Sequence, residues 1–471
     1  MSSSSISTRQ VPTTPIGQHR SLTAGGLAVL LVAYLPVNFA FGSVNVLAGD
    51  IGDDLSAGAS GTQLVLSAYT ATFAAALLVA GKLGDRFGRR RLITVGAVGT
   101  AVLNVAVACS PNLSVLIGTR ILLGIAAGLL TPQILATIQA TATGNRRTVG
   151  VMLFAAMSGG ATVIGQLTAG GVTATAPEHL GWRIVQVIGG AFALIAVFGA
   201  QAIPESRAQV RSTLDPVGSV MIGAALLALV SSLTLGPSLG WPVWVAAILI
   251  VALVLLVVFW GLQVRFERRG QVPVVPPSVV KIPTVRRGLI MTLLFFITYG
   301  AMLYELSTVA VAQFGMGAAG AALLVVGLGV AFVLTSILLP KLNRTAGSGT
   351  MMIGALVQAV ALIVTAVLIA TGHGGIWMLQ ITLVPIGVAQ SLMFGPLVGT
   401  VLSGASAHAA GAASGLISTS QQIGLSLGVT LLGGLFTTMS LGVGVGEAVL
   451  AIFAVHAVCA LVFVALAHRL R

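Results

Sequence analysis

The chain has 471 residues, of which 56% are hydrophobic and only 7% are charged, and its mean hydropathy is +1.05. Soluble domains carry about 25% charged residues, so this composition excludes a soluble globular protein and indicates one embedded in lipid. The net charge of +13 comes from basic residues in short clusters between apolar runs, with no continuous basic face. We therefore expect a membrane protein that binds no nucleic acid.

The apolar runs predict an all-α integral membrane protein with fourteen transmembrane helices. A spanning helix needs about 20 mostly apolar residues, and residues 1–22, rich in Ser, Thr and Pro, are expected to form a disordered cytoplasmic tail before the first span. The spans are predicted near residues 23–47, 61–82, 92–110, 113–139, 148–172, 184–203, 216–235, 242–263, 287–313, 317–340, 349–371, 376–402, 411–438 and 447–467.

The distribution of charge predicts the orientation. With the N-terminus in the cytoplasm, nearly all of the 23 Lys and Arg residues fall on the cytoplasmic side, the exceptions being Arg120 within a span and Arg183 at a span edge. The first outer loop carries Asp50, Asp53 and Asp54 instead. We expect a multi-pass protein of the inner membrane with both termini in the cytoplasm.

Basic clusters follow the second and the tenth span, eight spans apart, which indicates an internal repeat. We predict two six-helix halves at residues 23–203 and 287–471, an extra two-helix insert at 204–264 and a proline-rich cytoplasmic linker at 265–286. Repeated halves with a substrate site between them, near the midplane, are a known transporter plan.

The loop after the second span combines small residues with charges: Gly81, Asp85, Arg86, Gly88 and Arg89. Its spacing resembles the loop signature of the major facilitator superfamily, and that resemblance implies that Asp85 latches the two halves together in one access state. The simpler alternative is a positive loop that only sets the topology.

The fourth span carries Arg120, followed by Gly124, Gly128 and Pro132. This pattern is similar to the superfamily's fourth-helix motif, whose arginine is linked to proton transfer. An arginine within a span usually faces a cavity or a partner; the alternative is a side chain that reaches the outer headgroups.

The fifth span contains Gly165, Gln166, Gly170 and Gly171, and small residues at such spacing let helices approach closely. The pattern resembles the antiporter signature of the superfamily, with Gln166 where that signature has proline. Over the whole chain, the motifs resemble the fourteen-helix drug:proton antiporter branch, which implies export of drugs or antibiotics in exchange for protons.

The first span lacks the aspartate that this branch carries a few residues before an Asn-Val pair, because Ala40 stands at that position ahead of Asn45. Glu305 is the only carboxylate deep in any span, and it lies in the ninth helix, the repeat partner of the first. A low-dielectric surrounding disfavours a charged carboxylate, so Glu305 is the predicted proton carrier, assisted by Arg120. The alternative is a glutamate satisfied by Gln313 or Tyr304, or one that reaches the outer headgroups.

The remaining polar and aromatic residues of the same helices are candidates for the substrate cavity. Interhelical hydrogen bonding is the alternative role for such side chains. The candidates are Asn38, Asn45, Gln133, Tyr299, Gln390 and Phe394, and His456 in the last span is expected to pack between helices.

No Walker loop, zinc-ligand motif or nucleophile elbow occurs in the sequence. We therefore predict no enzymatic activity, no catalytic residue, no metal and no cofactor, with a proton gradient as the energy source and a small amphipathic compound as the substrate. A monomer in the lipid bilayer is expected. The alternatives are an uncoupled facilitator or importer of the same fold, and a non-transporting membrane sensor or assembly partner.

Overall fold

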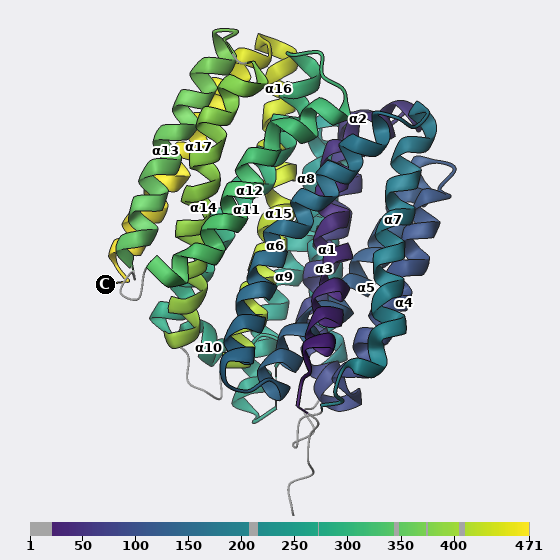
Figure 1. The fold of residues 1–471 in the computed structure, drawn as a ribbon, viewed down its shortest axis with the longest axis vertical. Coiled ribbons are helices and arrows are strands. Elements are labelled where there is room, and N and C mark those ends of the chain that lie inside the picture. Colours follow the sequence, from purple (N-terminus) through teal and green to yellow (C-terminus); the bar gives the residue numbers. More distant parts are fainter. Residues whose placement is uncertain are drawn as a thin grey trace, which may run out of the picture.

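The computed structural model describes residues 21–206, 215–271, 273–342, 348–373, 375–404 and 410–470. Within these ranges the chain is built of helices and contains no β-strand, and Figure 1 shows the long helices running side by side. Thirteen helices in the described part are long and apolar enough to cross a membrane, and α3, with 29 residues, is the fourteenth long helix. The prediction of an all-helical membrane fold with fourteen spans is confirmed.

The long helices are α1 (Ala24–Val46), α3 (Ala59–Phe87), α4 (Arg89–Ala108), α5 (Leu113–Thr141), α6 (Gly144–Thr173), α7 (Glu178–Gly199), α8 (Pro216–Leu239), α9 (Val243–Arg268), α11 (Pro283–Ala312), α12 (Ala318–Leu342), α13 (Ser348–Ala370), α14 (Ile376–Gly404), α15 (Ala410–Leu427) and α17 (Val445–His468). The chain connects α15 to α17 through a π-helical segment, η2 (Gly428–Gly433), and α16 (Gly434–Val443). The short elements are α2 (Ala48–Asp54), η1 (Ala200–Ala202) and α10 (Pro277–Lys281).

Two details of the helix ends follow from residue type. Helix α11 begins at Pro283, four residues before the predicted span, because a proline fits the first position of a helix, where its missing N–H is not needed. Gly88 alone separates α3 from α4 and has φ = 101°, a left-handed conformation that glycine adopts without strain. The sharp turn between α3 and α4 therefore rests on Gly88.

The two halves of the chain repeat one pattern of helix packing. In the first half α3 and α4 each pack on α5, α4 also packs on α7, and α1 packs on α6. In the second half α12 and α13 each pack on α14, α13 also packs on α17, and α11 packs on α15. The corresponding helices lie eight spans apart, so each half is one copy of the repeat.

The two halves meet along the pairs α6–α12 and α3–α15. We call the face at which α1 begins and α17 ends the terminal face, and the opposite face the far face. Four hydrogen bonds join the two halves toward the far face: Gln63 Nε2 to Tyr304 Oη (3.5 Å) and Thr437 Oγ1 (3.2 Å), Ser307 Oγ to Asn45 O (3.0 Å) and Ser426 Oγ to Ser67 O (3.2 Å). The structure is therefore closed at the far face.

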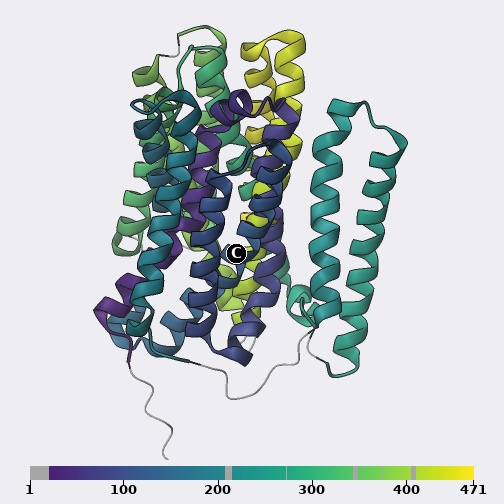
Figure 2. The same ribbon diagram turned by 90° about the vertical axis from the view of Figure 1, so that its right-hand side faces the viewer.

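The two extra helices form a hairpin at the flank of the bundle, as Figure 2 shows. Helix α8 packs on α3, whereas α9 packs mainly on α8 and leaves apolar side chains such as Val257 (73% exposed) uncovered. Asp215 caps α8 by accepting a hydrogen bond from Gly218 N at 2.8 Å, and Gln263 of α9 donates to the same carboxylate at 3.0 Å. These bonds join the two helices at the terminal face.

Parts of the predictions fall outside the described residues. Residues 1–20 of the tail predicted at 1–22 lie outside the description. Residues 207–214 of the insert predicted at 204–264 also lie outside it. The side chain of Asp85 also lies outside the description.

Candidate functional site

Glu305, the carboxylate deep in the ninth span, faces a histidine. Glu305 on α11 and His456 on α17 are both 0% exposed, and Nε2 of His456 lies 3.3 Å from Oε2 of Glu305. Neither oxygen of Glu305 and neither nitrogen of His456 has a hydrogen-bond partner among the described residues. Since a buried charge is costly without compensation, the two side chains depend on each other.

The two partners that the sequence suggested for Glu305 are engaged elsewhere. Gln313 donates its Nε2 hydrogen to the carbonyl of Ile369 at 2.6 Å, and the Tyr304 hydroxyl accepts from Gln63 across the boundary between the halves. Glu305 does not reach the headgroup region either, because it is fully buried. His456, expected only to pack, is instead the nearest ionisable partner of the buried acid.

Glu305 points away from the first half of the molecule. Ser307, two residues later on α11, donates to the carbonyl of Asn45 on α1. A helix turns by about 100° per residue, so Glu305 projects about 200° from Ser307, toward the interior of its own half. The proposed proton carrier and the contact between the halves therefore lie on opposite sides of α11.

Arg120 is held in the interior of the first half, not at the membrane boundary. The side chain is 0% exposed; Nε donates to the carbonyl of Val65 at 3.2 Å and Nη1 to that of Ala40 at 3.3 Å. The guanidinium also lies 4.7 Å from the centre of the Tyr69 ring, a cation–π distance. Its Nη2 has no partner among the described residues. Arg120 thus contacts the backbone of Ala40, the residue that stands in place of the first-helix aspartate, and meets no described carboxylate there.

Tyr299 and Phe394, two of the predicted cavity residues, belong to one aromatic cluster with Phe295 and Phe296. Ring centres of Phe394 lie 5.6 Å from Phe295 and 5.2 Å from Phe296, and Tyr299 stacks 6.2 Å from Phe295. The Tyr299 hydroxyl faces Thr162 of α6 in the other half. The cluster thus extends from α14 across α11 to the boundary between the halves.

The other predicted cavity residues are spread along this boundary and beyond it. Asn38 is buried beside Tyr34, whose ring stacks on Phe154 at 4.4 Å, and Gln390 is buried one turn before Phe394 with no partner for its amide among the described residues. Asn45 contributes its carbonyl to the contact with Ser307. Gln133 lies apart from this group.

Gln133 is packed within the first half near the terminal face. Its Nε2 donates to the carbonyl of Ala80 at 2.6 Å, and its side chain fills the space beside Gly84. It therefore holds α5 against α3, close to the loop that contains Gly88.

The four residues of the antiporter-like helix have different surroundings. A Cβ at Gly165 would lie 2.6 Å from the carbonyl oxygen of Phe39 on α1, and a Cβ at Gly170 would lie 2.7 Å from Ala322 Cβ on α12. Gly171 has nothing within 4 Å, and Gln166 is buried. Gly165 thus permits close packing within the first half, whereas Gly170 permits close packing between the halves.

The loop with the superfamily-like spacing joins three elements at the terminal face. Arg89 donates from Nη1 to the carbonyl of Ala136 on α5 at 3.1 Å, and its backbone N–H bonds to Ser206 O at 3.1 Å. Arg86 is exposed, Gly81 has nothing within 4 Å and Gly88 makes the turn. The structure therefore anchors Arg89 within the first half.

The sequence reasoning missed His456 as a partner and Phe295 and Phe296 as part of the aromatic cluster. A signal for His456 was present, because it is the only histidine deep in a predicted span, as Glu305 is the only such acid. In the part of the chain that the structure describes, no three His, Cys, Asp or Glu side chains gather as metal ligands would.

The comparison with family models matches the Major Facilitator Superfamily over residues 30–216 and 217–429. A probable actinorhodin transporter of Streptomyces coelicolor is 30% identical over 83% of this chain and 69% of its own length, and the puromycin resistance protein pur8 of Streptomyces alboniger is 31% identical over 86% and 80%. A tetracenomycin C resistance and export protein of Streptomyces glaucescens is 28% identical over 81% and 70%.

Solved structures agree on the fold. A crystal structure of the peptide transporter POT has a TM-score of 0.68 at 15% identity and covers 98% of this chain and 99% of its own. The xylose transporter XylE from E. coli, in a partially occluded inward-open conformation, has a TM-score of 0.62 at 16% identity, with coverage of 93% and 97%. The chain is a many-span transporter and not an enzyme, and it belongs to the major facilitator superfamily; its relatives named above are antibiotic transport, resistance and export proteins, which is consistent with the drug:proton antiporter branch.

Proposed function

We propose that this protein exports small amphipathic organic compounds, such as drugs or antibiotics, across the cytoplasmic membrane in exchange for protons, by alternating access. Export is supported by the resistance and export roles in the names of its relatives. The concentration of Lys and Arg on the terminal face supports a cytoplasmic location for that face and for both termini. The observation that carries proton coupling is the buried contact between Glu305 and His456.

We propose that this buried acid and base, 3.3 Å apart, share one proton. An apolar surrounding favours states without net charge, either carboxylic acid beside imidazole or carboxylate beside imidazolium. Removal of the proton leaves a lone buried carboxylate, and a second proton leaves a buried cation, and both states are costly. Proton release from Glu305 and His456 therefore accompanies a movement that separates α11 from α17 or admits water between them.

Helix α11 connects this proton site to the substrate. Its face opposite Glu305 carries Ser307, which bonds to α1, and the aromatic cluster reaches α6 through Tyr299. A substrate bound at this boundary changes the position of α11, and the change is transmitted to the contact with His456. Substrate and proton then act through one helix at two separate places, without direct competition for one carboxylate.

The aromatic cluster is the proposed platform for the apolar part of the substrate. Stacked and edge-on rings favour flat, partly aromatic compounds. Gln390, one turn before Phe394, is proposed to supply a polar group near the rings, and Asn38 a second polar group beside Tyr34 on α1. Arg120 is proposed to assist proton transfer from its buried position in the first half. The loop with Gly81, Asp85, Arg86, Gly88 and Arg89 is proposed as the latch of one access state.

The test is substrate-induced proton release from purified protein in proteoliposomes, with puromycin as the first of a panel of antibiotics and dyes. Wild type and Glu447→Gln, which changes an acid near the start of α17 that pairs with no described residue, should release protons. Glu305→Gln should bind substrate and release none. Release that persists in Glu305→Gln would assign the proton to another group and remove Glu305 from the mechanism.

A second function is favoured by one specific feature. Ala40 leaves Arg120 without the first-helix carboxylate, so an uncoupled facilitator of the same fold is the competing proposal. It predicts substrate flux down a concentration gradient with no proton release from either wild type or Glu305→Gln. The same proteoliposome experiment therefore separates the two functions.

A further inference from the structure

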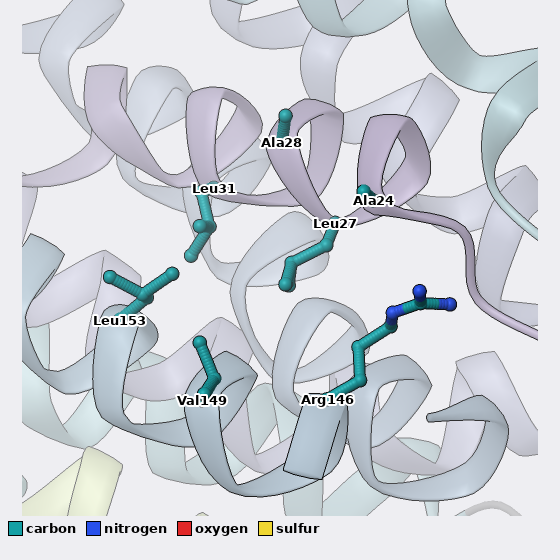
Figure 3. A pocket seen from close by; sticks show the side chains of 7 residues that line it. All are labelled: Ala24, Leu27, Ala28, Leu31, Arg146, Val149 and Leu153. Carbon is teal, nitrogen blue, oxygen red and sulfur yellow. The ribbon is translucent and has the colours of Figure 1, made fainter. Parts of the chain in front are cut away.

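A groove between α1 and α6 opens at the terminal face and encloses about 480 Å³, within the size range of small-molecule sites (roughly 300–1,000 Å³). Figure 3 shows apolar side chains of the two helices turned toward each other, with the Arg146 side chain beside them. The residues that line the groove include Ala24, Ala28 and Leu31 on α1 and Arg146, Val149 and Leu153 on α6.

The groove faces lipid and not the interior between the halves. Val149 and Leu153 are 38% and 37% exposed, and they continue into Ile164 and Leu167 (37% and 41%) at helical spacing along one face of α6. Ile164 and Leu167 lie in the part of α6 nearer the far face, where hydrogen bonds join the two halves, so their exposed apolar side chains are placed to contact lipid. The same face of α6 therefore contacts lipid at the groove.

The opposite face of α6 is turned to the interior. Thr162 is buried there and faces Tyr299 of the other half, and Phe154 stacks on Tyr34. Residues 153 and 154 are separated by about 100° around the helix, so Leu153 does not share the interior face with Phe154. The groove is accordingly separate from the proposed substrate site.

Arg146 places a cation at the mouth of this apolar groove. Its Nη1 donates to the carbonyl of Leu22 at 2.8 Å, which orients the guanidinium toward the start of α1. The residue is exposed, and among the described residues no carboxylate pairs with it. Val149 and Leu153 lie three and seven residues deeper in α6, about 4.5 Å and about 10.5 Å below Arg146 at 1.5 Å per residue.

A cation at the membrane surface above an apolar groove directed into the membrane matches one chemistry, that of an acidic phospholipid. We propose that this groove binds an anionic phospholipid of the leaflet at the terminal face, with its phosphate on Arg146 and the upper part of one acyl chain between α1 and α6. Basic pockets between transmembrane helices recognise lipid headgroups in this manner. The bound lipid fills the space where α1 and α6 diverge and stabilises their contact at the terminal face.

The test measures lipid retention and needs no transported substrate. Protein is reconstituted in nanodiscs of equal phosphatidylglycerol and phosphatidylcholine, extracted, and examined for retained lipid by native mass spectrometry. Wild type should retain more phosphatidylglycerol than phosphatidylcholine. Arg146→Gln should lower that retention about fivefold, the effect of one basic residue at a membrane surface.

Two further variants distinguish a defined site from general surface charge. Arg147→Gln removes the neighbouring exposed arginine, which projects about 100° away, and should leave retention unchanged. Ala28→Phe fills the groove without a change of charge and should lower retention as Arg146→Gln does. Equal loss in Arg146→Gln and Arg147→Gln, full retention in Ala28→Phe, or no preference for phosphatidylglycerol in wild type would each overturn the proposal.

Discussion

Two glycines of α6 that look alike in sequence should respond in opposite ways to alanine. A Cβ at position 165 would lie 2.6 Å from the Phe39 carbonyl oxygen and 3.0 Å from both Phe39 Cα and Ser43 N, all backbone atoms of α1. Ordinary contact begins at 3.4 Å, so Gly165→Ala requires α1 and α6 to separate locally by up to about 0.8 Å. Gly171→Ala, six residues later, meets nothing within 4 Å.

The magnitude follows from the difference between the two variants. Both replace glycine by alanine in a helix and so gain the same helix propensity, about 1 kcal/mol. Only Gly165→Ala adds the strain of overpacking, typically about 1–3 kcal/mol, because a backbone carbonyl cannot rotate away as a side chain would. We therefore expect Gly171→Ala to be as stable as wild type or slightly more stable, and Gly165→Ala to lie about 1–3 kcal/mol below Gly171→Ala.

The assay is reversible unfolding of the purified protein in mixed micelles of increasing denaturing detergent, followed by intrinsic tryptophan fluorescence. The free energies of unfolding of wild type, Gly165→Ala and Gly171→Ala are compared at one protein concentration. Equal stability of the two variants would show that α1 and α6 have room for a methyl group at position 165, and the reasoning from close packing would fail.

Three further predictions each rest on the contacts of one residue. Gly170→Ala should weaken the closed far face, because its Cβ would lie 2.7 Å from Ala322 Cβ of the other half; a cysteine placed at Gln63 should then react faster with a soluble thiol reagent, and an unchanged rate would contradict this. Arg120→Lys keeps the charge but loses two hydrogen bonds to carbonyl groups and the contact with the Tyr69 ring. The apparent Tm should therefore fall by an amount equivalent to about 1–3 kcal/mol, and an unchanged Tm would contradict the prediction. Asp54→Asn removes the partly exposed 2.9 Å ion pair with Arg183, so the free energy of unfolding should fall by at most about 1 kcal/mol. The difference from wild type should shrink at high salt, and a difference that does not depend on salt would refute this prediction.

Much of the fold was predictable because lipid restricts what a chain can do. A backbone that crosses a membrane must satisfy its hydrogen bonds internally, so each long apolar run becomes a helix, and counting such runs led to fourteen. Helix ends were less predictable. Helix α11 begins at Pro283, and a proline in the sequence can mark either an interruption between helices or the first residue of one. The resemblance of the Gly81–Arg91 loop to the superfamily signature agrees with the family match over most of the chain.

The sequence by itself determined which side chains are rare in this membrane protein: one deep acid, Glu305, one deep histidine, His456, and one deep arginine, Arg120. Only the tertiary structure decided what each of them meets. Helix rotation turns Glu305 away from the other half and helix packing brings α17 to it, whereas Arg120 meets the carbonyl group of Ala40 and no acid among the described residues. The same holds for Gly165 and Gly171. Both glycines lack a side chain and so allow close packing, but only at Gly165 does a neighbouring helix, α1, come close enough to need it.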